Sequence, residues 1–94
     1  VYVGKAVKYF SNINVAEFML EAGELKLGDK LLVTGPTTGA LFATLEEARV
    51  DLKPVEVVHK REHFSMKFAE KIRPSDKLYK LISAEELKKS RTKE

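Results

Sequence analysis

The sequence contains no cysteine and no tryptophan, and only 3 of its 94 residues are proline. Without cysteine there can be no disulfide bridge, thiolate metal ligand or cysteine nucleophile, and the composition fits a reducing cytoplasm. No apolar run approaches the roughly 20 residues that a membrane-spanning helix needs, and the N-terminus lacks the basic and apolar blocks of a signal peptide. We therefore expect a cytoplasmic protein that makes no contact with a membrane.

A strong excess of charge of one sign is also missing. The chain has 17 Lys and Arg residues against 14 Asp and Glu residues, which gives a net charge of +3. Adjacent basic residues occur only at Lys60–Arg61 and Lys88–Lys89, whereas nucleic-acid binders usually concentrate their basic residues. A surface of mixed charge is therefore favoured over a dedicated RNA-binding face, and RNA binding stays open as an alternative.

The length and the hydrophobic content define one small domain with a core of its own. Ninety-four residues leave no room for a second domain, and hydrophobic residues make up 44% of the chain, which excludes the composition of a disordered protein. The sequence begins at Val1, not at Met, and enters a strand-like pattern at once. We therefore expect a piece of a longer protein.

Short β-patterned segments separated by turn residues run from Val1 to about Ile82. The candidate strands are Tyr2–Phe10, Ile13–Leu20, Leu31–Val33, Gly39–Leu45, Ala48–Val57 (interrupted at Lys53–Pro54), Phe64–Phe68 and Leu78–Ile82. The apolar phase slips within the second segment, which predicts a β-bulge near Ala16–Glu17. This pattern predicts an all-β domain, a small closed antiparallel β-barrel of six or seven strands, because a sandwich would need a longer chain.

Two short segments of the chain resemble each other. Leu25–Leu31 and Ile72–Leu78 each contain an apolar residue, a tight turn that ends in Asp, and the start of a strand. Asp29 and Asp76 are expected to accept backbone N–H groups within these turns. The segment Gly35–Gly39 is likewise predicted to form a tight turn, because it lacks the Gly-Lys-Ser/Thr ending of a phosphate-binding loop.

The C-terminal residues change character. Ser83 and Glu86 have the spacing of a capping box, with acidic residues in the first turn and basic residues in the last. We expect a short helix, frayed at its end, over residues 83–94, and a β-barrel over residues 1–82.

One motif suggests catalysis. His59, Glu62 and His63 have the H-x-x-E-H spacing of an inverted zinc-peptidase signature. That chemistry requires both histidines on one helical face together with a third ligand, but the flanking residues are strand-patterned and the chain has only 2 histidines. The segment is therefore predicted to connect two strands. We expect no catalytic residue, no metal and no cofactor, with His59 and His63 as a weak alternative zinc site.

Exposed aromatic and basic residues are the candidates for binding. Most Phe and Tyr residues should lie in the core, but Tyr9, Phe10 and Phe42 occur near turns or on faces with mixed partners. An exposed apolar patch at these residues would mark docking to another domain. Basic residues that could accompany them or contact RNA are Lys5, Lys8, Lys60 and Arg61.

Several segments in order along the chain carry a resemblance to a known family. The segments are Val3–Lys5, Tyr9–Phe10, Glu21–Leu25, Gly28–Asp29 and Gly35–Gly39. Together they resemble the C-terminal domain of the collagenase-like peptidases of family U32, over most of residues 1–82. The Gly-Asp turns are more distantly similar to the second-domain β-barrel of translation elongation factors. The sequence departs from the U32 pattern at Lys60–Glu62, where a glycine-containing turn is common, and at Ser75, where glycine would precede the aspartate.

The resemblance implies a parent protein with a larger catalytic domain that precedes this one. The chain would be a non-catalytic accessory module that docks on that domain and helps to bind or position a protein or RNA substrate. No catalytic residue of the family matches a position of this chain. Some members of the family are linked to hydroxylation of RNA bases, so the resemblance leaves the reaction of the parent, proteolysis or RNA modification, open.

Overall fold

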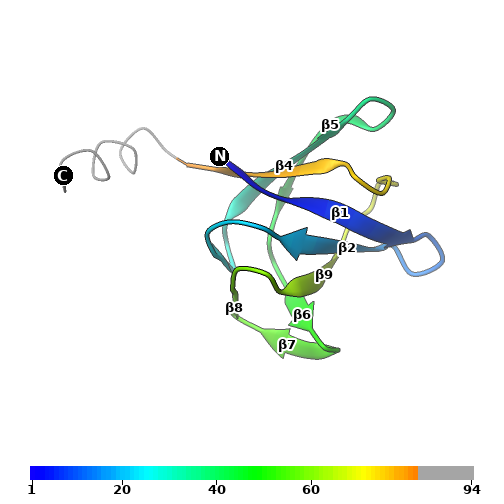
Figure 1. Cartoon of the computed structure of the whole chain (residues 1–94). Coiled ribbons are helices and arrows are strands. Elements are labelled where there is room, and N and C mark those ends of the chain that lie inside the picture. The colour runs from blue at the N-terminus through cyan, green and yellow to red at the C-terminus, as the bar shows by residue number, and fades with distance from the viewer. Residues whose placement is uncertain (83–94) are drawn as a thin grey trace, which may run out of the picture.

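The computed structural model describes residues 1–82 and shows a domain made of β-strands without a helix in that range. The predicted all-β class is therefore confirmed, and the helix expected over residues 83–94 lies outside the described residues. Figure 1 shows the strands, which are β1 (Tyr2–Phe10), β2 (Val15–Leu20), β3 (Leu25–Lys26), β4 (Lys30–Gly35), β5 (Gly39–Thr44), β6 (Ala48–Val50), β7 (Lys53–Val55), β8 (Val57–Val58), β9 (His63–Lys67) and β10 (Lys77–Leu81).

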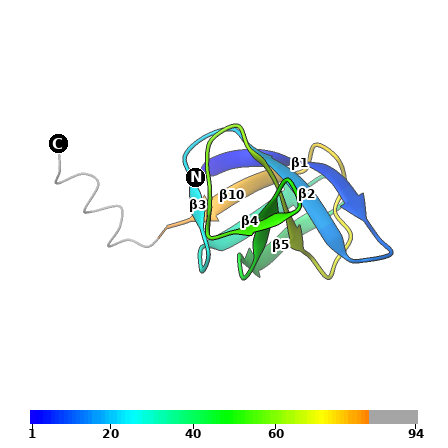
Figure 2. The same ribbon diagram turned by 90° about the horizontal axis from the view of Figure 1, so that it is seen from below.

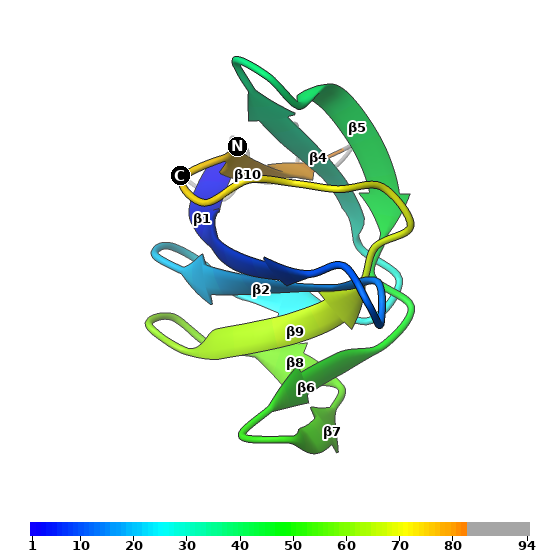
Figure 3. The same cartoon turned by 90° about the vertical axis from the view of Figure 1, so that its right-hand side faces the viewer.

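Eight of the strands form one antiparallel sheet in the order β5-β4-β10-β1-β2-β9-β6-β7, and β3 pairs with β8 in a second sheet. The large sheet curls strongly, so that β4 and β5 lie over β1, β2 and β9 (Figure 3). It does not close by hydrogen bonds, because in residues 1–82 the order ends at β5 and β7. The predicted closure of the barrel was therefore wrong. The strands that follow β5 in the chain, β6, β7 and β8, have only 3, 3 and 2 residues and so offer few backbone groups for pairing with β5.

The core consists of buried apolar side chains from most of the strands, and the sheet that surrounds it is strongly curved (Figure 2). Alternate residues of β2 point inward, and Ala16, Phe18 and Leu20 are fully buried. Phe18 stacks on Phe64 of the neighbouring strand with 5.5 Å between ring centroids. Such aromatic pairs add to the free energy gained from burial of their surface.

The predicted bulge near Ala16–Glu17 was placed on the wrong strand. β2 starts at Val15 and keeps a single alternating phase. The register shift lies opposite it, in β1 between Ala6 and Lys8. Ile13 belongs to the preceding turn, so the apparent slip in the apolar phase came from the turn and not from a bulge in β2.

The predicted Asp turns are confirmed, and a third turn has the same hydrogen bond. The Lys26 N–H donates to Asp29 Oδ2 over 2.8 Å, and the Arg73 N–H donates to Asp76 Oδ2 over 2.9 Å. In the third turn the His59 N–H donates to Glu62 Oε1 over 2.7 Å. The residue before each acid has a positive φ, which is 96° at Gly28, 74° at Arg61 and 74° at Ser75.

Ser75 therefore holds a backbone conformation that favours glycine. Replacing Ser75 with glycine is expected to raise the free energy of unfolding by about 0.5–1 kcal/mol, because the side chain no longer clashes with its own backbone. Urea unfolding measures the effect. Ser75→Ala keeps a β-carbon and should give no gain, and a loss of stability in Ser75→Gly would contradict this explanation.

Asp76 is the buried charged residue of the described range, with 3% of its surface exposed. Its carboxylate also accepts a hydrogen bond from the Thr38 hydroxyl in the turn between β4 and β5. The Ala6 N–H of β1 donates to the backbone oxygen of Asp76 over 2.7 Å. Gly35 packs directly against the carboxylate, where a β-carbon would overlap it. The Gly35–Gly39 segment is therefore a structural turn that Asp76 holds in place.

Candidate binding surfaces

An apolar groove of about 450 Å³ crosses the outer face of β1, β2, β9 and β6. Apolar side chains from two turns and two strands line it, namely Phe10, Ile13, Val15 and Leu52. Charged residues surround them, and the ion pair between Arg49 and Glu47 (3.5 Å) lies at the rim. We call this surface the Leu52 groove. An apolar centre within a polar rim is an arrangement that protein interfaces also have.

Leu52 lies in the two-residue turn between β6 and β7, where Asp51 and Leu52 have φ angles of 52° and 66°. Two central residues with positive φ define a type I′ turn, which favours Asn-Gly. A leucine in this position is strained, and 88% of its surface is exposed. Its side chain therefore gains little from burial in the described domain, and strain of this kind is a pointer to function.

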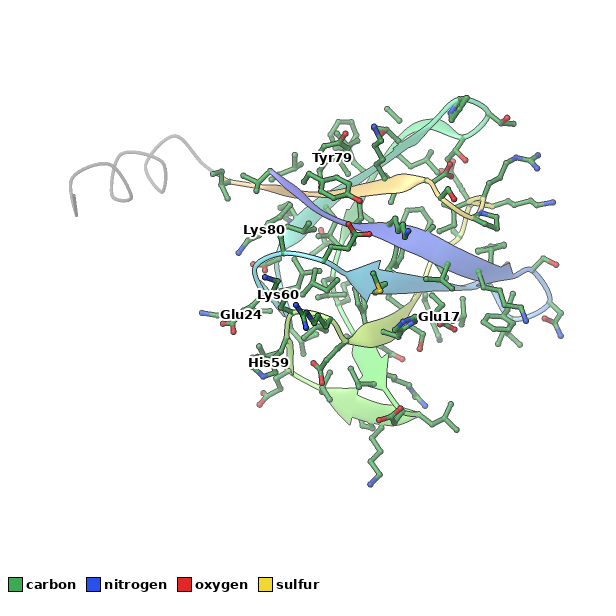
Figure 4. All side chains as sticks on the ribbon, viewed as in Figure 1. Glu17, Glu24, His59, Lys60, Tyr79 and Lys80 are labelled. Atoms are coloured by element: carbon green, nitrogen blue, oxygen red, sulfur yellow. The ribbon has the colours of Figure 1, made fainter. Side chains whose placement is uncertain are left out.

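A second candidate surface is formed by aromatic and apolar residues aligned across four strands. The register pairs Tyr2 of β1 with Tyr79 of β10, Tyr79 with Leu32 of β4, and Leu32 with Phe42 of β5. The Tyr2 and Tyr79 rings meet edge to face at 5.7 Å. Phe42 has 72% of its surface exposed. We call this row the aromatic stripe, and Figure 4 shows Tyr79 within it above β10.

Lysine side chains flank the aromatic stripe on both sides. Lys5 and Lys77 are paired across β1 and β10 in the next row. On the other side, the Lys30 Nζ donates to the Thr44 hydroxyl over 3.0 Å. Glu21 is the nearby acid: it accepts a hydrogen bond from the Tyr2 hydroxyl and lies 3.9 Å from Lys5 Nζ. The stripe is thus an apolar row on a predominantly positive part of the surface.

The pKa of Tyr2 is raised above its usual value. Partial desolvation is the main cause, followed by the hydrogen bond to Glu21, the negative charge of Glu21 and the neighbouring Tyr79. All of these favour the protonated phenol. Tyr2 is therefore a neutral hydrogen-bond donor at physiological pH.

The structure distributes the sequence-predicted binding residues over several places. Phe42 lies in the aromatic stripe and Lys5 beside it, whereas Phe10 lines the Leu52 groove, with Lys8 Nζ 5.1 Å from the centre of its ring. Tyr9 packs against the core, and its hydroxyl donates to the Phe68 carbonyl over 2.9 Å. The remaining two, Lys60 and Arg61, occupy the turn between β8 and β9. The seven residues therefore do not form one site, and their role in binding stays a prediction.

The first four residues of the H-x-x-E-H motif, His59–Glu62, connect β8 to β9, as the strand-patterned flanks predict, and His63 begins β9. His59 Nδ1 lies 3.2 Å from Glu24 and His63 Nδ1 lies 3.1 Å from Glu17. Figure 4 shows Glu24 beside His59 and Glu17 farther along the sheet. The Glu62 carboxylate caps its own turn. In residues 1–82, no three His, Asp or Glu side chains are grouped as metal ligands would be.

Sequence reasoning missed Leu52 and most of the aromatic stripe. Tyr2 and Tyr79 come from opposite ends of the described chain, and their pairing depends on a strand register that the sequence does not show. Leu52 could have been recognised, since the alternation of Ala48–Leu52 breaks just before Lys53–Pro54. A two-residue turn centred on Asp51–Leu52 would have predicted positive φ angles at both residues.

No family model matches the chain, but curated proteins and solved structures do. The chain is 50% identical over 86 residues to a collagenase of Porphyromonas gingivalis, covering 92% of this chain and 21% of that protein. It is 31% identical over 81 residues to an uncharacterized protease of Methanocaldococcus jannaschii, covering 86% and 20%. The chain thus spans about a fifth of the length of the curated relatives it matches.

The fold is that of the C-terminal domain of a U32 peptidase. The crystal structure of this domain from Geobacillus thermoleovorans superposes with a TM-score of 0.79 at 14% identity, covering 86% of this chain and 92% of that one. The selenomethionine variant of the same domain gives 0.78 at 14% identity, covering 83% and 96%. The resemblance to the U32 C-terminal domain that the sequence indicates is therefore confirmed.

The described part of the chain gives one further finding about membranes. Among residues 1–82 there is no helix with the length and hydropathy needed to cross a bilayer.

Proposed function

We propose that the chain is a non-catalytic accessory domain of a longer U32-peptidase-like protein and that it binds the larger catalytic domain of that protein through the Leu52 groove. Two findings support a longer parent. The fold is similar to the U32 C-terminal domain, and the chain covers only 21% of the length of a curated relative. We further propose that the accessory domain covers residues 1–82 and ends before residues 83–94, and that the parent works in the cytoplasm.

The observation that carries the docking proposal is the conformation of Leu52. The turn holds an apolar side chain at a φ of 66° with 88% of its surface exposed. A glycine or asparagine would relieve the strain there. An apolar residue in that position gains free energy when a partner covers it together with Ile13, which is 59% exposed.

The proposed role of the accessory domain is to hold a polypeptide substrate for the catalytic domain. Two curated relatives are named collagenase and protease. We propose that the parent of this chain also acts on polypeptides. The aromatic stripe supplies an exposed apolar surface on paired strands, and strands position binding side chains more precisely than loops do. The basic residues predicted for RNA are divided between the β1 strand and the β8–β9 turn, so we favour a polypeptide.

The test compares stability and docking in one variant. Leu52→Gly is expected to stabilise the isolated chain by about 1 kcal/mol, because glycine tolerates the positive φ. The same change is expected to weaken binding to the separately purified catalytic domain by about tenfold, because the apolar contact of one leucine is lost. Urea unfolding and isothermal titration calorimetry measure the two effects.

The control is Phe42→Ala, which removes a comparable apolar side chain from the aromatic stripe and should leave docking unchanged. Equal affinity of the Leu52→Gly variant and the unmodified chain would contradict the docking proposal. Cleavage of gelatin by the purified chain alone would contradict the non-catalytic role.

A further inference from the structure

The two edges of the large sheet differ in how well they are protected against pairing with another strand. β7 contains Lys53 and Pro54, and edge strands that avoid unwanted pairing carry lysine and proline in this way. β5, at the other edge, has the sequence Gly-Ala-Leu-Phe-Ala-Thr over 6 residues, without a charge or a proline. In residues 1–82 the one strand that pairs with β5 is β4. The outer backbone groups of β5 are therefore available to another strand.

We propose that β5 binds an extended polypeptide segment as an added antiparallel strand. This inference rests on the proposed function, in which the parent acts on a polypeptide. Strand addition uses the backbone N–H and C=O groups of an open edge, and side chains in alternate positions give the specificity. Gly39–Thr44 offers such an edge at one side of the large sheet (Figure 1), and its Phe42 ends the aromatic stripe.

Phe42 sets which type of side chain is preferred at one position of the bound segment. It is 72% exposed on the outer face and is the last member of the aromatic stripe. A residue directly opposite it on an added strand would have its β-carbon within contact distance of the ring. We therefore expect an aromatic or β-branched residue in that position of the segment.

Lys30 sets which type of side chain is preferred at a second position of the bound segment. Its Nζ donates to the Thr44 hydroxyl over 3.0 Å, which holds the ammonium group above the end of β5. In the part of the chain that the structure describes, no carboxylate lies within ion-pair distance of Lys30. An acidic residue opposite Thr44 would face this charge. The preferred segment therefore has an acid two positions before its aromatic residue, because Thr44 and Phe42 are two residues apart on one face.

The experiment uses the 94-residue chain and the synthetic peptide Thr-Glu-Thr-Phe-Thr-Val-Thr, titrated by NMR and by amide hydrogen exchange. We expect saturable binding and slower exchange of amides in residues 39–44. The backbone N–H and C=O groups of Ala40, Phe42 and Thr44 face the free edge, because those of the residues between them pair with β4. A peptide with the same side chains and N-methyl groups on its Glu, Phe and Val residues should therefore not bind, because these are the N–H groups that would pair with β5. Phe42→Lys should weaken binding about tenfold by removing the aromatic contact. Lys30→Glu should reverse the preference, favouring the peptide with Lys in place of Glu.

Four results would overturn the proposal. The N-methylated peptide could bind equally well, the protected amides could lie outside β5, or a single-stranded oligonucleotide could protect β5 in place of the peptide. A dimer of the unmodified chain in light scattering that Phe42→Lys converts to a monomer would assign the edge to a second copy. Leu52→Gly is the matched control and should leave peptide binding unchanged. Peptide binding and Leu52-dependent docking are separate readouts, so either can fail without the other.

Discussion

Replacing Asp76 with alanine is expected to lower the free energy of unfolding by about 2–3 kcal/mol, which corresponds to a fall of roughly 10–20 °C in Tm for a domain of this size. The carboxylate accepts hydrogen bonds from the Arg73 N–H and the Thr38 hydroxyl, and its loss leaves both donors without this partner. The change also opens a void against Gly35. Thermal and urea unfolding followed by circular dichroism measure the loss.

The matched control is Asp29→Ala, in the equivalent turn before β4. Asp29 accepts the Lys26 N–H over 2.8 Å and pairs with Lys80 at 3.4 Å, with 21% of its side chain exposed. Water can replace these partners more easily than those of a buried carboxylate, so we expect a loss of about 1 kcal/mol. Equal losses for the two variants would show that Asp76 only caps its own turn and does not hold the β4–β5 hairpin.

Gly4→Ala is expected to cost about 3 kcal/mol, because β1 and β2 approach each other too closely at this point for a side chain. A β-carbon on Gly4 would overlap the Met19 carbonyl oxygen and lie 3.3 Å from the Leu20 Cα. These are backbone atoms of a paired strand and cannot move aside without disturbing the register. Chemical denaturation of the variant measures the cost.

Gly23→Ala separates this steric effect from the general cost of losing a glycine. Gly23 has a φ of 69° and no atom within 4 Å of the β-carbon position. Its substitution should cost about 1 kcal/mol, through backbone strain alone. A Gly4→Ala variant no less stable than Gly23→Ala would contradict the close approach of β1 and β2.

The sequence predicted features that depend on neighbouring residues, such as strands and turns. It did not predict which distant strands pair with each other. Alternating apolar residues located most strands, and the Asp residues at positions 29 and 76 marked turns that the structure confirms. Both features depend on residues a few positions apart. The very short β3 and β8 left no periodic signal, since two residues cannot define an alternation.

The candidate surfaces depend on contacts that sequence spacing does not encode. The aromatic stripe exists because the register places Tyr2, Tyr79 and Phe42 in one row across four strands. Tyr9 has the same residue type as Tyr2, yet its hydroxyl reaches Phe68 and its ring packs on the core. The U32 resemblance identified the type of domain correctly, but it could not assign these residues to a surface or to the core.

The two surfaces have different proposed roles, one in docking and the other in substrate binding. The Leu52 groove exposes apolar side chains from two turns, one of them strained, and is the proposed docking surface. The aromatic stripe and the edge of β5 present an ordered row on rigid strands. A domain that both docks and holds a substrate would carry its function in these surfaces and leave the reaction to its partner.

Amide hydrogen exchange of the chain, alone and within its full-length parent protein, tests the docking claim most directly. We expect the turns at residues 11–14 and 50–53 to exchange more slowly in the parent, because the catalytic domain covers the Leu52 groove, while residues 39–44 keep the same rate until a peptide is added. Identical exchange at residues 11–14 and 50–53 in both forms would show that the groove faces solvent in the parent and would contradict the account.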